Sequence, residues 1–84
     1  MHVAVRYKND DIVRWLCENH KQLINAKKGY SKWTPLHEAG NYASVHAVKI
    51  LLEYGADPLA KAFDGKTPAE ITYCIPAKEI IEKW

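Results

Sequence analysis

The chain has 84 residues, enough for one small domain, and its 48% hydrophobic and 26% charged residues are ordinary globular values that exclude an intrinsically disordered protein. Twelve basic and ten acidic residues leave a net charge of +2, which is too small to indicate a nucleic acid, a membrane surface or an acidic substrate by charge alone. No apolar run approaches the roughly 20 residues of a membrane helix, and no signal-peptide pattern opens the chain, so the sequence predicts an intracellular protein, cytoplasmic or nuclear. Because only two cysteines are present, we expect their thiols to be reduced.

The N-terminal third of the chain is predicted to contain an amphipathic helix followed by a long loop. Asp10 and Asp11 suit the first turn of a helix, where carboxylates interact favourably with the helix dipole. The apolar residues that follow have the spacing of one helix face: Ile12, Val13, Leu16 and Cys17. Residues 19–33 are predicted to form an extended loop.

A second helical unit is predicted to begin at Thr34. Its hydroxyl can cap a short helix whose first turn holds Pro35, where a proline loses no hydrogen bond. Ser44 is predicted to cap a second helix that ends at Gly55, because glycine suits the left-handed conformation that follows a helix. The apolar stripe of this helix repeats the first stripe after 35 residues: Ala47, Val48, Leu51 and Leu52.

A third unit is predicted from the same signals. Thr67-Pro68 repeats Thr34-Pro35 after 33 residues, and Pro76 is predicted to start another second helix. Its apolar stripe is Ile80, Ile81 and Trp84. Self-similarity at a fixed period indicates a repeat architecture, in which stacked units share a continuous core.

The repeated motifs are Thr34-Pro35-Leu36-His37-x-Ala39, Val48-x-x-Leu51-Leu52, Gly55-Ala56-Asp57 and Asp64-Gly65-x-Thr67-Pro68. In these motifs the chain resembles the ankyrin repeat family over essentially its whole length. The resemblance implies an all-α solenoid of stacked helix–turn–helix units with short extended loops. The expected units are 1–33, an N-terminally truncated repeat, 34–66, a full repeat, and 67–84, a C-terminal capping repeat.

Some positions depart from the family pattern. Gly40 stands where alanine is usual, Ala43 where the glycine between the helices is usual, and Glu70 in place of the motif histidine. At the C-terminal end, Lys83 is expected to match Trp15 and Ile50 and to give the last unit a polar outer face. The N-terminal end, by contrast, is apolar at residues 3–5, so we expect further repeats or domains upstream in the parent chain.

The sequence holds no recognisable catalytic or metal-binding pattern. There is no Cys-x-x-Cys or His-x-x-x-His spacing, phosphate-binding glycine loop or nucleophile elbow, so we expect neither an enzyme nor a bound metal or cofactor. The resemblance implies that His37 is a structural hydrogen-bonding group that links adjacent loops, and His2 stands in the matching place of the first unit. Cys17 is expected to be buried and Cys74 more exposed.

The resemblance implies that function lies in a concave groove formed by the first helices and the loop tips. The matching helix positions are Arg6, Tyr7, Asn41, Tyr42, Cys74 and Ile75, and the matching loop positions are Lys27, Lys28, Tyr30, Ser31, Trp33, Lys61, Phe63, Asp64 and Lys66. This set is rich in aromatic residues and lysines, which suits an acidic segment of another protein with an apolar anchor. Trp33 is the expected anchor of the interface, and the competing interpretation makes it a core residue.

Other interpretations stay open at this point. Tyr30 and Phe63 could pack on neighbouring loops as a small satellite core. The lysines and aromatic residues of the loops could bind nucleic acid weakly, with strong salt dependence. The chain could also be an architectural or autoinhibitory segment of a larger multidomain protein. We expect a protein–protein interaction module, with nucleic acid and membrane binding disfavoured.

Overall fold

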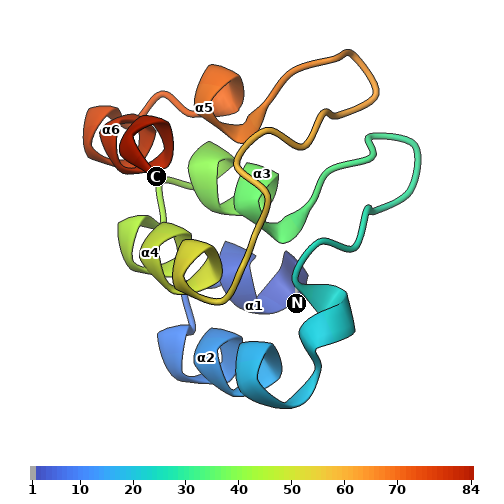
Figure 1. Cartoon of the computed structure of the whole chain (residues 1–84), viewed down its shortest axis with the longest axis vertical. Helices are drawn as coiled ribbons and strands as arrows, with labels where there is room; N and C mark the ends of the chain where they lie inside the picture. The colour runs from blue at the N-terminus through green and yellow to red at the C-terminus, as the bar shows by residue number, and fades with distance from the viewer. Residues whose placement is uncertain (1) are drawn as a thin grey trace.

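The computed structural model describes residues 2–84, and this part of the chain is all-α (Figure 1). Its helices are α1 (His2–Arg6), α2 (Asp10–Asn19), α3 (Pro35–Asn41), α4 (Val45–Glu53), α5 (Pro68–Ile71) and α6 (Ile75–Lys83), with a 3₁₀ turn at Lys21–Leu23. They form antiparallel pairs stacked along the long axis, and two long loops project from one side of the stack (Figure 1). Between residues 2 and 84 the β pairing is a single bridge, Lys28 with Trp33.

The helices begin and end where local chemistry predicts. Asp10 and Asp11 lie in the first turn of α2. Thr34 and Thr67 are the N-cap residues of α3 and α5, each followed by proline in the first turn. Gly55 follows α4 with φ of +99°, in the left-handed region that glycine adopts without strain. These expectations are confirmed.

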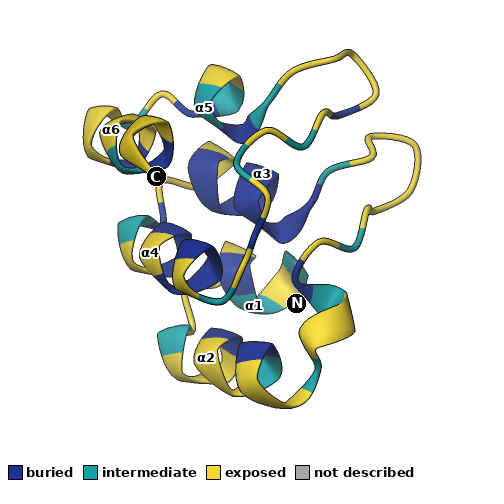
Figure 2. Cartoon of the chain, in the orientation of Figure 1, coloured by how far each residue is buried: buried dark blue, intermediate teal, exposed yellow. Residues whose placement is uncertain are grey.

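The core lies between two rows of helices. The second helices pack in the order α2, α4, α6, and the first helices in the order α1, α3, α5, so that α3 and α4 occupy the middle of the stack. Figure 2 shows the burial concentrated on these two helices. Residues 34–40 are all buried, and so are Ala47, Val48, Ile50, Leu51 and Leu52 of α4.

The register of the last helix differs from the sequence prediction. Helix α5 has four residues where α3 has seven, so α6 begins 30 residues after α4 and not 33. Ile80, not Lys83, therefore matches Ile50, and the assignment of Lys83 as the capping residue is wrong. The placement of Cys74 and Ile75 on a first helix is wrong for the same reason, since they form the start of α6.

In the corrected register, two faces of the second helices can be distinguished. Val13 and Cys17 of α2 are fully buried even though α2 lies at one end of the stack, so they face α4. Their counterparts in α4 are buried, whereas those in α6, Lys78 and Glu82, are exposed. The polar outer face expected of a terminal unit exists, and these two residues provide it.

The opposite face of α2 is apolar and open. Ile12 is 47% exposed and Trp15 is 55% exposed, whereas the matching Ala47 and Ile50 of α4 are buried. The sequence predicts Ile12 on one apolar helix face with Val13, but of these two residues only Val13 is buried. Trp84 departs in the same way, because it follows α6 and is 59% exposed.

The departures from the family pattern have geometric consequences. A Cβ atom at Gly40 would lie 3.1 Å from Thr72 Cβ and 3.2 Å from the Pro68 carbonyl oxygen, so glycine lets α3 and α5 approach closely. Ala43, between α3 and α4, has φ of +55°, a left-handed conformation that costs any residue with a Cβ atom. Ser44 is the N-cap of α4, but its hydroxyl donates to the Val5 carbonyl of α1 instead of capping the helix.

Candidate interaction surface

Each of the two loops is fixed to a first helix by a histidine side chain. His37 Nε2 lies 2.9 Å from the Lys66 carbonyl oxygen, and Nδ1 lies 3.1 Å from the Thr34 backbone nitrogen and 2.8 Å from its hydroxyl. Since a carbonyl only accepts, Nε2 carries the proton and Nδ1 accepts from the Thr34 backbone N–H. Burial lowers the pKa of His37, and the bond to the Lys66 carbonyl opposes only part of that effect.

His2 makes the equivalent contact one unit earlier. Its Nε2 donates to the Trp33 carbonyl oxygen at 2.8 Å, and burial lowers its pKa as well. The structural role expected for both histidines is supported by this geometry. In residues 2–84, no three His, Cys, Asp or Glu side chains gather in a way that could hold a metal ion.

The loop tips present aromatic side chains to solvent. Tyr30 is 97% exposed and Phe63 79%, so the alternative of a satellite core beneath the loops is wrong. The loops are joined through the backbone instead, where the Phe63 N–H donates to the Ser31 carbonyl at 2.8 Å. Tyr7, which follows α1, is 75% exposed. These three rings are free to contact a partner.

Trp33 has an intermediate position between the surface and the core. It is half-buried, and its ring stacks on His37 with centroids 6.3 Å apart and an interplanar angle of 15°. Its backbone carbonyl accepts from the N–H of Lys28 and from the ring of His2. One face of this indole is therefore used inside the protein, and only the remaining surface is available to a partner.

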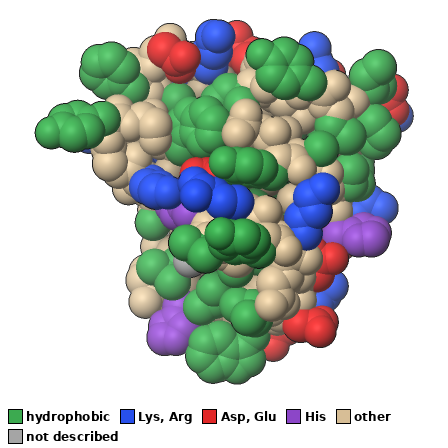
Figure 3. Space-filling model, turned by 180° about the vertical axis from the view of Figure 1, so that it is seen from behind, with side chains coloured by type: hydrophobic (Ala, Val, Ile, Leu, Met, Phe, Trp, Pro, Cys, Tyr) green, Lys and Arg blue, Asp and Glu red, His purple; other side chains and the backbone are tan. Residues whose placement is uncertain are grey.

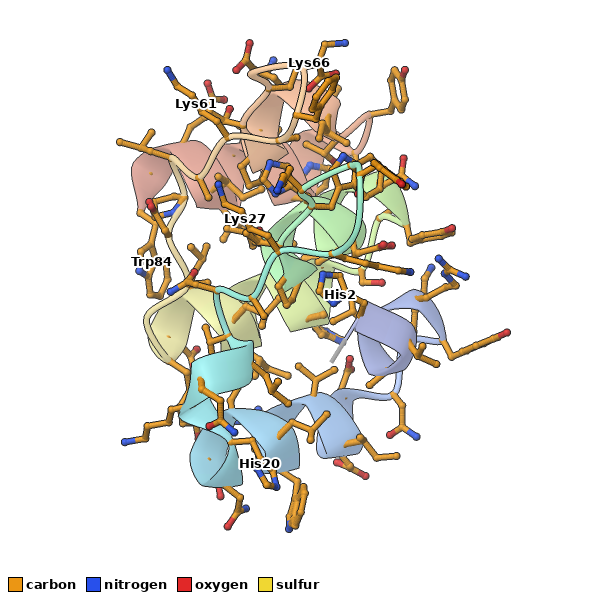
Figure 4. The ribbon with its side chains drawn as sticks, turned by 90° about the vertical axis from the view of Figure 1, so that its right-hand side faces the viewer. His2, His20, Lys27, Lys61, Lys66 and Trp84 are labelled. Atoms are coloured by element: carbon orange, nitrogen blue, oxygen red, sulfur yellow. The ribbon has the colours of Figure 1, made fainter. Side chains whose placement is uncertain are left out.

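The lysines of the loops fall into two groups. Lys27 and Lys28 are engaged: the Lys27 ammonium donates to the Lys61 carbonyl at 3.3 Å, and the Lys28 ammonium lies 3.9 Å from the Glu38 carboxylate. Lys61 and Lys66 are exposed, and Figure 4 places them on the second loop and Lys27 on the first. Asp64 is also exposed, but one of its oxygens accepts the backbone N–H of Lys66.

A buried carboxylate joins the first helices to the first loop. The side chain of Glu38 in α3 is 4% exposed, with Oε1 4.0 Å from the Arg6 guanidinium and 3.9 Å from the Lys28 ammonium. The Arg6 guanidinium carbon lies 5.4 Å from the centre of the Tyr42 ring. Asn41, the last residue of α3, precedes Tyr42 in the sequence and is exposed. Figure 3 shows basic and hydrophobic side chains side by side on this face.

Sequence reasoning missed three contributors to the surface and its support. Glu38 fell outside the predicted set, since one glutamate in a short helix gives no sign of burial. Tyr73 is 93% exposed on the link between α5 and α6. Asn25 connects the first two units, donating to the Gly55 carbonyl and accepting the Asp57 N–H.

Comparison with known proteins agrees with the repeat architecture of the structure. A family model described as ankyrin repeats, three copies, matches residues 1–73. A BTB/POZ domain and ankyrin repeat-containing protein, NH5.2, of Oryza sativa subsp. japonica is 35% identical over 84% of this chain and 14% of its own length. A similar protein of Lotus japonicus, NBCL, is 37% identical over 81% of this chain and 14% of its own. The 2-5A-dependent ribonuclease of Homo sapiens is 35% identical over 77% of this chain and 9% of its own.

The chain thus spans about a tenth to a seventh of the length of these relatives. No helix within residues 2–84 has the length and hydropathy needed to cross a membrane.

Proposed function

The chain belongs to the ankyrin repeat family, and we propose that it is a non-catalytic module that binds an acidic segment of another protein through the groove between its first helices and its loops. Ankyrin repeats are generally protein–protein interaction modules without catalytic activity. The finer parts of this proposal concern the face used and the chemistry of the partner. They rest on the side chains that this chain places at the surface.

The observation that carries the proposal is the exposure of aromatic residues at the loop tips and after α1. Tyr7, Tyr30 and Phe63 are each at least 75% exposed, and Lys61 and Lys66 of the second loop are exposed as well. Burying large rings in water-free contacts is the main source of affinity at interface centres, and a rim of charges adds selectivity. Exposed rings of this kind have no role in the packing of the chain itself.

The other functions considered from the sequence receive less support. Nucleic-acid binding would need several loop lysines to meet phosphates, but the Lys27 ammonium already donates to the Lys61 carbonyl, and the chain carries a net charge of only +2. An architectural role beside other domains stays a prediction, and so do additional repeats upstream, although the relatives are much longer multidomain proteins.

The test of the proposal is quantitative affinity capture with mass spectrometry, using the wild type and matched variants of the exposed rings. We expect Tyr30→Ser with Phe63→Ser to lose the captured partner while the thermal midpoint stays unchanged, since both side chains lie in solvent. Glu53→Ser, on the exposed side of α4, is the control and should keep the partner. Retention of every partner by the loop variant would contradict the proposal.

A first prediction concerns Trp33. We expect Trp33→Ala to weaken binding of the captured partner by roughly 2 kcal/mol, the scale of an interface hot spot. Because the ring also stacks on His37, we expect a loss of stability of about 1–2 kcal/mol, more than for an exposed side chain. Calorimetric titration and urea unfolding measure the two effects separately. A loss of stability with unchanged affinity would show that Trp33 serves packing alone.

A further inference from the structure

We propose that Arg6 is the residue of this surface that binds an acidic group of the partner, with Tyr42 and Glu38 holding its guanidinium in place. The inference rests on the proposed function and adds the chemical group recognised and the residue that recognises it. It is carried by the Arg6, Tyr42, Glu38 and Lys28 cluster.

The guanidinium of Arg6 is oriented but keeps its hydrogen-bonding capacity. Its carbon lies 5.4 Å from the Tyr42 ring centre, within the range of a cation–π interaction. Its nearest acid, Glu38, is 4.0 Å away, beyond hydrogen-bond distance, and among residues 2–84 no acceptor forms a hydrogen bond with the guanidinium. With the side chain 40% exposed, its planar set of N–H donors can meet a ligand.

Glu38 explains why the guanidinium stays in this place. Its side chain is 4% exposed, and its Oε2 atom is buried without a hydrogen-bond partner. A buried carboxylate is stabilised by opposite charge close by, so it attracts both Arg6 and Lys28 toward the surface of α3. This arrangement restricts the side chain of Arg6 before a partner arrives, which lowers the entropy lost on binding.

The charge of the cluster favours an anion over a cation. Two basic groups surround one carboxylate, which leaves one unit of positive charge on the surface. A basic partner group would not reach Glu38 Oε2 without moving the side chains around it, because that oxygen is buried, and Glu38 Oε1 already faces Arg6 and Lys28. A carboxylate or phosphate would instead neutralise the excess charge and pair with the guanidinium through two parallel hydrogen bonds.

The experiment titrates the protein with three capped pentapeptides, each with tryptophan at the centre and glutamate, glutamine or phosphoserine at the other positions. Backbone and arginine side-chain NMR signals report binding. We expect the glutamate or phosphoserine peptide to shift the Arg6 Nε–H signal and the glutamine peptide not to do so. Comparison of the two acidic peptides tells whether a carboxylate or a phosphate is preferred.

Arg6→Lys keeps the charge but removes the planar donor set, and we expect it to weaken binding of the acidic peptide by at least about tenfold. Arg14→Gln removes an exposed charge from α2 and is the matched control, with little change expected. In Glu38→Gln we expect faster exchange of the Arg6 Nε–H with water, because the carboxylate no longer holds the guanidinium in place. If that variant does not fold, the comparison of Arg6→Lys with Arg14→Gln still decides the question.

Three results would overturn the inference: equal affinity in Arg6→Lys, equal binding of the glutamine peptide, or no binding of either acidic peptide. If affinity capture still depended on Tyr30 and Phe63 in any of these cases, the proposed function would stand and only the role of Arg6 would fall.

Discussion

One position of the repeat shows how a single residue type determines what a unit can contact. His37 accepts from Thr34 within its own unit and donates to the Lys66 carbonyl of the following loop. Glu70 occupies this position in the last unit, where its carboxylate accepts from both the backbone and the hydroxyl of Thr67. Those hydrogen bonds lower the pKa of Glu70, the backbone bond most. A carboxylate can cap its own helix, but it cannot donate to a neighbouring carbonyl.

The lowered pKa values of His2 and His37 predict a loss of stability in mild acid. Since burial lowers the pKa of His2 and His37 below the ordinary 6.5, the unfolded chain binds protons more readily than the folded one. The free energy of unfolding should therefore be fully developed above pH 6.5 and fall as the pH drops through the folded-state pKa values. Urea unfolding at about pH 7.5 and about pH 5.5 measures this change.

The double variant His2→Gln with His37→Gln keeps a donor at each ring position but does not titrate, so its stability should vary less between these two pH values. NMR titration of the ring protons would assign the effect to each histidine. A folded-state pKa of His37 above 6.5, or stability that rises on acidification, would contradict the prediction.

At the scale of the helices, the links between them carry backbone strain. Lys8, between α1 and α2, and Ala43, between α3 and α4, have φ of +57° and +55°. The resemblance pointed to Ala43, where glycine is usual, but nothing in the local sequence marks Lys8. A left-handed residue with a Cβ atom costs about 1–2 kcal/mol, and both links bear this cost because the paired helices must turn back within a few residues.

Ala43→Gly should stabilise the protein. Removing the Cβ relieves the left-handed strain, and the greater freedom of glycine in the unfolded chain offsets part of the gain, which leaves about 0.5–1 kcal/mol. Ala43→Val should destabilise it, because a branched side chain tolerates this conformation less. Urea midpoints of the two variants test the prediction, and a lower midpoint for Ala43→Gly than for the wild type would refute it.

The sequence predicted helix starts better than helix register. Thr34-Pro35 and Thr67-Pro68 set the beginnings of α3 and α5 through local capping chemistry, which any reader of the sequence can recognise. The length of α5 depends instead on how the last unit packs, and because α5 is three residues shorter than α3, the register of α6 is shifted.

At the candidate interaction surface, the position of Tyr30 and Phe63 in the loops was enough to predict their exposure. The burial of Glu38 depends on Arg6 and Lys28, which are distant in sequence.

Across the whole molecule, the two ends of the stack differ in chemistry. One end presents Ile12 and Trp15 of α2, 47% and 55% exposed, and the other presents the charged pair Lys78 and Glu82 of α6. Inside the stack, the surface of α2 that meets α4 is apolar, with Val13 and Cys17 fully buried. The charged pair thus prevents the α6 end from offering an apolar surface to the exposed α2 face of another copy.

Replacing the pair by its α4 counterparts, Lys78→Val with Glu82→Leu, should make the protein self-associate. The two complementary faces lie at opposite ends of one molecule, so the contact is head-to-tail and does not close into a dimer. We expect sedimentation velocity to show species that grow with concentration, and adding Trp15→Lys should return the protein to the monomer. Lys83→Leu is the control: Lys83 matches the exposed Glu53 of α4, so this change should leave the protein monomeric. Self-association of Lys83→Leu but not of the double variant would contradict this prediction. It would favour the register in which Lys83 matches Ile50.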